Sequence, residues 1–328
     1  MTKVLLLSLG ILLLSCNQGN KPTEAEPIKV KTEVPAFDAD SAYAYTEKQV
    51  SFGYRIPSTQ EHKQCADYLS ASLENFGAKV FRQETTLKAY DGTNLEAINI
   101  IGSFNPEGKT RILLCSHWDT RPFSDHVPNP ANHRKPLLGA DDGASGTGIL
   151  LEVARQLGQK APNVGVDIIF FDAEDYGIPV FDRGTYNNST DDSYCLGSKF
   201  WANNPHVAGY KAKFGILLDM VGAKNATFYL EGLSRKYASR YVEEIWAAAR
   251  NLGYGKYFIK SQGGYITDDH EQIIQGRGIP CVDIINYDPQ SDSGFGTYWH
   301  TQNDTMDNIS KETLKAVGET VLQVVYNN

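Results

Sequence analysis

The stretch Val166-Asp167-Ile168-Ile169-Phe170-Phe171-Asp172-Ala173-Glu174-Asp175-Tyr176-Gly177 joins an apolar run to an abrupt acidic end. The β-branched and aromatic run predicts a buried strand, and a strand that is apolar on both faces is typical of a parallel sheet covered by helices. Ligands of such sheets bind outside the carboxyl ends of the strands. Glu174 and Asp175 are therefore candidate site residues, although a single acidic pair after a strand more often caps a turn or helix.

The same pattern recurs, which favours a site over independent caps. Three more apolar runs lead into histidine or acidic residues: 111–115 precedes His117 and Asp119, 214–218 precedes Asp219, and 279–285 precedes a loop with His300. These residue types are zinc ligands and general acid/base groups. Chemistry of the metallohydrolase kind is the leading interpretation.

Strands and helices alternate along the rest of the chain. Further strands are predicted at 79–87 and 96–104, and helices at 59–76, 145–157, 235–252, 270–275 and 310–325. His62 is expected on the solvated surface of the first of these helices, and His126 in a surface loop. The pattern predicts an α/β fold: a single-domain three-layer α/β/α structure with a mixed, mostly parallel central sheet.

The N-terminus has the layout of an export signal. One lysine precedes a short apolar run from Val4 to Leu14, which is too short to span a bilayer. The run ends in Leu13-Leu14-Ser15-Cys16, which resembles the lipobox of bacterial lipoproteins; an ordinary cleaved signal is the alternative. We expect a signal peptide at 1–15, a lipid-anchored tether at 16–36 with lipid on Cys16, and the folded domain at 37–328.

Charge and cysteine content exclude some partners. The formal net charge is −8, which argues against nucleic acid and against an anionic membrane surface, so the only membrane contact expected is the anchor. The four cysteines after Cys16 show no CxxC spacing, which indicates neither a zinc knuckle nor a disulfide framework.

Five motifs resemble, in order, those of the M28 metallopeptidase family: His117-Trp118-Asp119, 139–146 (GADDGASG), Glu174-Asp175, Asp219-Met220-Val221-Gly222 and 298–301 (YWHT). The likeness covers nearly all of the chain after the tether and implies a zinc aminopeptidase-like fold. Within the family, the chain is more similar to the glutaminyl cyclases of the Bacteroidetes type. Trp299 immediately precedes His300, and Asp268 stands where aminopeptidases commonly carry serine.

The resemblance implies a role for each motif residue. Asp142, Asp175 and His300 would bind one zinc ion per chain, and Trp299 and His117 would line the substrate pocket. Three carboxylates would be catalytic: Glu174 as the proton-transfer residue, and Asp219 and Asp268 as an adjacent network. Asp175 departs from the animal cyclases, which carry glutamate there.

The implied chemistry calls for these residue types. An N-terminal glutamine cyclises to pyroglutamate when its α-amine attacks its own side-chain amide and expels ammonia, which requires an electrophile such as zinc and a proton shuttle. Two alternatives stay open: a two-zinc M28 aminopeptidase, with His117 and Asp219 holding the second metal, and a non-catalytic peptidase-like binding domain. The substrates expected are peptides or proteins with N-terminal glutamine. We expect a monomer in the bacterial cell envelope, facing the periplasm.

Overall fold

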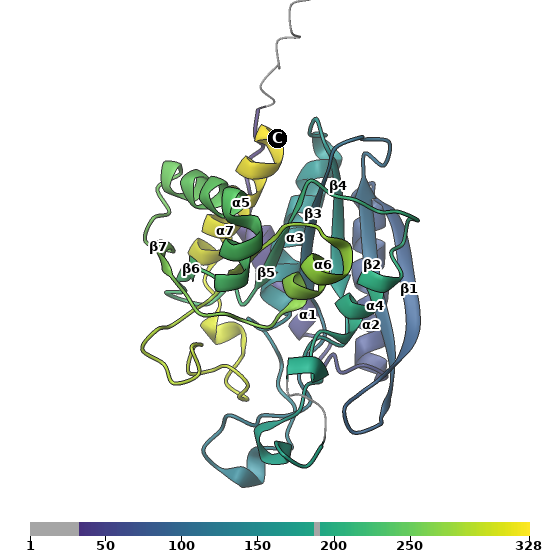
Figure 1. Cartoon of the computed structure of the whole chain (residues 1–328), viewed down its shortest axis with the longest axis vertical. Coiled ribbons are helices and arrows are strands. Elements are labelled where there is room, and N and C mark those ends of the chain that lie inside the picture. The colour runs from purple at the N-terminus through teal and green to yellow at the C-terminus, as the bar shows by residue number, and fades with distance from the viewer. Residues whose placement is uncertain (1–32, 187–190) are drawn as a thin grey trace, which may run out of the picture. The chain divides into compact units, whose positions relative to one another are not determined.

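The computed structural model describes residues 33–186 and 191–328. Its main sheet has six strands (Figure 1), in the order β1 (Lys79–Lys88), β2 (Asn94–Phe104), β4 (Gly165–Phe171), β3 (Arg111–His117), β5 (Phe214–Asp219) and β8 (Cys281–Ile285). The four strands β4, β3, β5 and β8 are mutually parallel, whereas β2 is antiparallel to both of its neighbours. The predicted mixed, mostly parallel sheet is confirmed.

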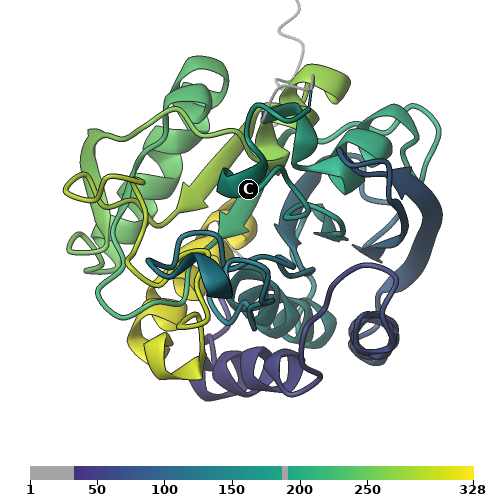
Figure 2. The ribbon, with the colours of Figure 1, turned by 90° about the horizontal axis from the view of Figure 1, so that it is seen from below.

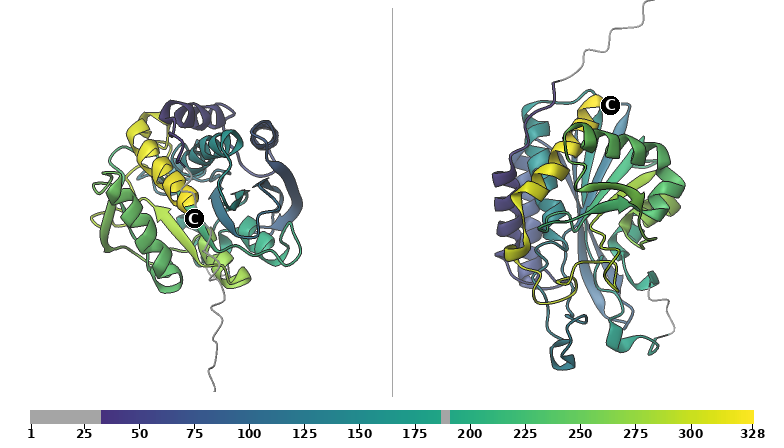
Figure 3. Two further views of the ribbon diagram at one scale, coloured as in Figure 1. Left: turned by 90° about the horizontal axis from the view of Figure 1, so that it is seen from above. Right: turned by 90° about the vertical axis from the view of Figure 1, so that its left-hand side faces the viewer.

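Alternating side chains of the sheet face two separate cores. Ile168 and Phe170 of β4 pack into one core, and Ile169 and Phe171 pack into the other. The first is covered by α1 (Ala39–Val50), α2 (Gln60–Asn75), α3 (Ala144–Gln159) and α7 (Lys311–Asn327). The second is covered by α4 (Leu196–Asn203) and α6 (Asp269–Arg277), while α5 (Gly232–Asn251) packs beside β8. Both faces of the sheet are therefore buried, as Figure 3 shows.

All five predicted helices are present. Capping explains where two of them begin: the side chain of Thr59 accepts the N–H of His62 at the start of α2, and the side chain of Ser310 accepts the N–H of Thr313 at the start of α7. The prediction for His62 was wrong. Its side chain is 1% exposed, lies 2.7 Å from Asp172 and stacks on Trp118.

Two α-helices and two β-strands of the described residues were not predicted: α1, α4, β6 (Phe228–Leu230) and β7 (Phe258–Gln262). The two strands pair in a small parallel sheet. The buried face of α1 consists of Ala42, Thr46 and Gln49, so no apolar stripe marks it in the sequence. The strands β6 and β7 are short, and most of β7 is exposed.

The loops after β3, β4 and β8 gather at the carboxyl ends of the parallel strands, at the lower end of Figure 1 and toward the viewer in Figure 2. Among the helices that the structure describes, none is long and apolar enough to cross a membrane. The signal peptide and Cys16 lie outside the described residues, and the proposed domain boundaries stay predictions.

Candidate metal centre and active site

Asp142 is held by a tight loop before α3. Gly143 follows it with φ 102°, and a Cβ there would lie 2.5 Å from the carbonyl oxygen of Asp119, so this position requires glycine. The buried carboxylate of Asp304 accepts the backbone N–H groups of both Asp141 and Asp142, at 2.8 and 3.0 Å. The Asp142 side chain is thereby fixed at the carboxyl end of the sheet.

Glu174 and Asp175 follow β4 across a left-handed residue, Ala173 with φ 52°. The carboxylate of Asp119, from the loop after β3, accepts the backbone N–H of Glu174 at 3.1 Å and that of Asp175 at 3.2 Å. Asp119 therefore orients these two residues without being a metal ligand itself. The two acidic side chains are thus directed by their backbone rather than by a helix cap.

His300 also has a left-handed backbone, with φ 51°, and its ring stacks on Trp299 at a centroid distance of 3.8 Å. His126 packs against the same indole, with ring centroids 4.3 Å apart. His126 lies in a loop, as predicted, but it is half-buried against Trp299 and is not fully exposed. Burial and the nearby Arg121 lower the pKa of His300 to about 3, which keeps its imidazole neutral.

Asp142, Asp175 and His300 meet, as the resemblance implied. Their potential ligand atoms all lie within 4.8 Å of one another; Nε2 of His300 is 3.3 Å from Oδ1 of Asp175 and 3.7 Å from Oδ2 of Asp142. Tetrahedral zinc, with bonds of about 2.0–2.2 Å, separates ligand atoms by roughly 3.3–3.6 Å. Oδ2 of Asp175 is buried and has no hydrogen-bond partner among the described residues, so a ligand position is left for a metal. The residues fit zinc.

His117, Asp142 and Asp219 form a second group with ligand atoms within 4.8 Å of one another. Nε2 of His117 is 3.0 Å from Oδ1 of Asp142 and 3.2 Å from Oδ1 of Asp219. Burial would lower the pKa of His117, but hydrogen bonds with three aspartates raise it well above the usual value. Asp142 belongs to both groups, so the geometry suits either one metal or two.

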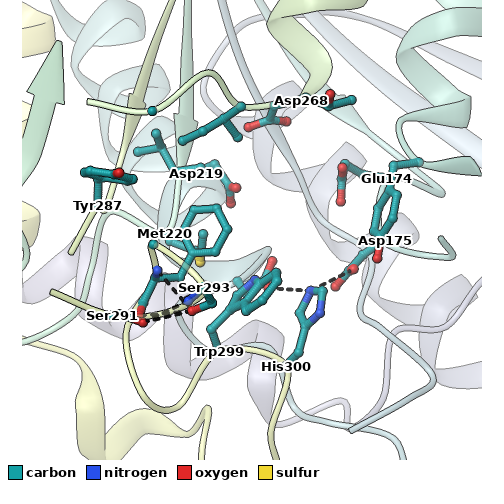
Figure 4. Close-up of a pocket in the computed structure, with 18 of the residues that line it drawn as sticks. Glu174, Asp175, Asp219, Met220, Asp268, Tyr287, Ser291, Ser293, Trp299 and His300 are labelled. Carbon is teal, nitrogen blue, oxygen red and sulfur yellow. Dashed lines mark hydrogen bonds and ion pairs between the residues drawn. The ribbon is translucent and has the colours of Figure 1, made fainter. Parts of the chain in front are cut away.

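The three candidate catalytic carboxylates border a cavity of about 500 Å³. Figure 4 shows Glu174, Asp219 and Asp268 turned toward it, with Trp299 and His300 on the opposite side. His117 differs from expectation: its side chain is 1% exposed and lies behind Asp142 and Asp219 rather than among the described lining residues. In this structure it contacts the carboxylates of Asp142 and Asp219 and does not line the cavity.

Comparison with known proteins assigns this site to a family. The model of peptidase family M28 matches residues 99–325. The chain belongs to peptidase family M28.

Solved structures similar to this chain include both an exopeptidase and a glutaminyl cyclase. A Zn-dependent exopeptidase from Parabacteroides distasonis is 63% identical, with a TM-score of 0.88 over 90% of this chain and all of that one. A glutaminyl cyclase from Tannerella forsythia is 62% identical, with a TM-score of 0.87 and the same coverage. The glutaminyl-peptide cyclotransferase of Bos taurus is 29% identical over 69% of this chain and 64% of its own length, just under two thirds.

Burial dominates the electrostatics of the M28 site. It raises the pKa of Glu174 well above the usual range, and the negative charges of Asp175 and Asp268 raise it further. Burial also raises the pKa of Asp268 well above its usual value, with repulsion from Asp219 next in size. These carboxyl groups therefore hold protons more firmly than exposed ones, which suits proton transfer near neutral pH.

The sequence did not reveal several residues of the M28 site. Cys195 has a left-handed backbone, and its buried thiol lies 3.1 Å from Oε1 of Glu174. The hydroxyl of Tyr298 donates to Asp141 at 2.6 Å, which ties the Trp299 loop to the Asp142 loop. The remaining lining residues come mainly from loops: Arg183, Tyr194, Met220, 264–267, Ile285, Tyr287 and 291–295. Cys195 lies outside the five motifs, and although Tyr298 belongs to the last of them, its bond to Asp141 depends on how the two loops meet.

Proposed function

We propose that this protein converts the N-terminal glutamine of peptides or proteins to pyroglutamate, with release of ammonia. One observation carries the proposal: the metal-ligand group of Asp142, Asp175 and His300 lies in one cavity with three further carboxylates and the ring of Trp299. The similarity to glutaminyl cyclases from several organisms supports it.

Asp142, Asp175 and His300 would hold one zinc ion, with Nε2 of the histidine and a carboxylate oxygen from each aspartate as ligands. Zinc bound there would supply Lewis-acid polarisation of the glutamine side-chain carbonyl. The ligands contribute two negative charges and one neutral imidazole, which balance the charge of the ion. We propose one zinc ion per chain.

Glu174 would be the proton shuttle. Ring closure forms a bond between the α-nitrogen and the side-chain carbonyl carbon and breaks the bond from that carbon to the amide nitrogen. Glu174 accepts the proton that the α-nitrogen loses and returns it to the departing nitrogen, which leaves as ammonia. Its carboxylate borders the cavity, where it can reach a bound substrate.

Asp219 and Asp268 would serve the leaving group. Two adjacent carboxylates in a buried site resist ionising together, so one of them retains a proton that it can donate in a hydrogen bond to the nitrogen as it departs. Trp299 borders the same cavity and would pack against the aliphatic part of the glutamine side chain. The α-amine and the amide would in this way be held close together for ring closure.

An assay of the purified protein tests the proposal. We expect a peptide with N-terminal glutamine to lose ammonia and become blocked to Edman degradation, while aminoacyl chromogenic substrates stay intact. Release of free amino acids without pyroglutamate would refute it and would favour the two-zinc aminopeptidase. That second candidate is supported by the group of His117, Asp142 and Asp219.

We further propose that Cys16 carries the lipid that anchors the chain in the bacterial cell envelope, facing the periplasm, with the folded domain acting as a monomer. The motif Leu13-Leu14-Ser15-Cys16 supports the anchor. Cys16→Ala should release the protein from membranes or block its processing. Unchanged fractionation and migration on a denaturing gel would show that no lipid is attached there.

A further inference from the structure

A buried ion pair lies beside the proposed metal centre, in the loop after β3. Nε and Nη2 of Arg121 donate to the two carboxylate oxygens of Asp125, at 2.8 and 2.9 Å. The side chains are 0% and 1% exposed. A buried ion pair is weak evidence for a gain in stability, because desolvation offsets most of the attraction. The other contacts of the pair show what it does in this fold.

The guanidinium also holds the segment that carries Asp175. Nη1 of Arg121 donates to the backbone oxygen of Asp175 at 3.0 Å and approaches its Oδ1 at 3.3 Å. The same nitrogen donates to the backbone oxygen of Gly177 at 3.3 Å. With Oδ1 engaged, Oδ2 of Asp175 stays free of hydrogen bonds within the described chain. The arginine therefore holds both the backbone and the side chain of Asp175 in place.

The carboxylate of the pair faces the other side of His300. Oδ1 of Asp125 lies 3.7 Å from Nδ1 of the imidazole, while Nε2 points at Asp142 and Asp175. A shift of about 0.5–1.0 Å would close the 3.7 Å gap to a hydrogen bond. The backbone reinforces this arrangement, because the N–H of His126 donates to the carbonyl of His300 at 3.2 Å.

We propose that Arg121 and Asp125 are positioning residues that act as one clamp on two metal ligands from separate loops. Arg121 orients Asp175, and Asp125 orients His300 so that Nε2 faces the metal. Histidine ligands commonly donate their second ring N–H to a carboxylate, and the loss of such partners typically weakens metal binding about 10- to 100-fold. The clamp also suits an aspartate ligand, whose side chain is too short to adjust if its backbone moves.

Zinc affinity of the full chain, measured by competition with a chromogenic chelator, tests the clamp without any substrate. We expect Arg121→Met to weaken zinc binding about 10- to 100-fold. Arg121→Lys keeps the positive charge but not the planar guanidinium, so its zinc affinity should fall between those of the wild type and Arg121→Met. The double variant R121M/D125L removes the pair without leaving a buried charge, and it should keep its fold while binding zinc weakly.

A second bidentate pair provides the control. Arg111 donates to both oxygens of Asp167 at 2.6 Å, at the opposite end of β3 and β4 from the ligands. Arg111→Met should lower the melting temperature but change zinc affinity less than about threefold. If Arg121→Met does not fold, the zinc affinities of R121M/D125L and Arg121→Lys are compared with that of the wild type instead.

Two results would overturn the clamp: folded Arg121 variants that bind zinc as tightly as the wild type, or an equal loss of affinity in Arg111→Met. The inference rests on the proposed ligands but not on cyclisation. Failure of the wild type to bind zinc would overturn the metal centre and the clamp together. Loss of cyclisation with intact zinc binding would affect only the proposed function.

Discussion

Replacing Glu174 with glutamine tests the proposed proton shuttle most directly. The substitution keeps the shape of the side chain, and the thiol of Cys195 can still donate to the remaining oxygen. Positioned acid/base groups contribute about 10²–10⁴ in rate. An oxygen of Asp268 lies within 4.8 Å of a carboxylate oxygen of Glu174, so Asp268 can replace Glu174 as a less well placed proton acceptor. We therefore expect a loss of about 10²–10³ in kcat, or about 3–4 kcal/mol.

The same variant should bind zinc normally. Asp175 is directed by its own backbone N–H, which donates to Asp119, and this bond does not involve the side chain of Glu174. Stability without metal should change in the opposite direction from activity. The pKa of Glu174 is higher in the folded protein than in the unfolded chain, so the folded state loses stability as pH rises above about 4. Glu174→Gln removes this cost and should raise the melting temperature at neutral pH.

Three measurements decide the outcome: ammonia release at saturating peptide, zinc content after dialysis, and melting temperature of the metal-free protein at pH 4 and pH 7. A rate close to that of the wild type would refute the shuttle. Recovery of activity in excess zinc would show that Glu174 acts as a ligand. A melting temperature that falls at pH 7 would contradict the sign derived from burial.

Three further predictions follow from the same contacts. Asp175→Asn should weaken zinc binding and recover activity in added zinc; a loss that zinc does not repair would assign Asp175 to proton transfer instead. Cys195→Ala should lower kcat, measured by steady-state kinetics, about 2- to 12-fold through loss of one hydrogen bond to Glu174. Cys195→Ser should restore most of the rate, and equal rates for both variants would exclude a role for the thiol contact. Asp268→Ser should raise the zinc content measured by elemental analysis from one toward two equivalents, because Asp219 then ionises without repulsion from Asp268. A content that stays at one would show that Asp268 does not control binding of a second zinc ion.

The central sheet could be predicted because its information is local. Each of the four parallel strands is an apolar run, and each leads into a motif or a motif-bearing loop. Amphipathic periodicity predicted α2 in the same way. His62 lies on the stripe shared with Cys65, Leu69 and Leu73, so its burial was readable from spacing, but a polar side chain was assigned to solvent. Helix α1 gave no comparable signal, because small and polar residues make its buried face.

The site divides along similar lines. The metal ligands and Glu174 could be proposed because the family motifs carry them, and the structure brings all of them to one edge of the sheet. Arg121 and Asp125 lie in a loop, and their contacts with Asp175 and His300 depend on how three loops meet. Sequence spacing contains no information about such contacts. The residues that position the ligands therefore became visible only in three dimensions.

We expect Asp219 to decide between cyclisation with one metal and peptide hydrolysis with two. It is the carboxylate shared between the second metal-ligand group and the pair formed with Asp268. A carboxylate that shares a proton with its neighbour is a poor metal ligand, because binding a second ion requires that proton to leave. In the proposed mechanism, Asp268 would therefore donate a hydrogen bond to the departing nitrogen and at the same time oppose binding of a second ion. On this hypothesis, the residue at position 268, the N-cap of α6, would couple the number of metals to the type of reaction.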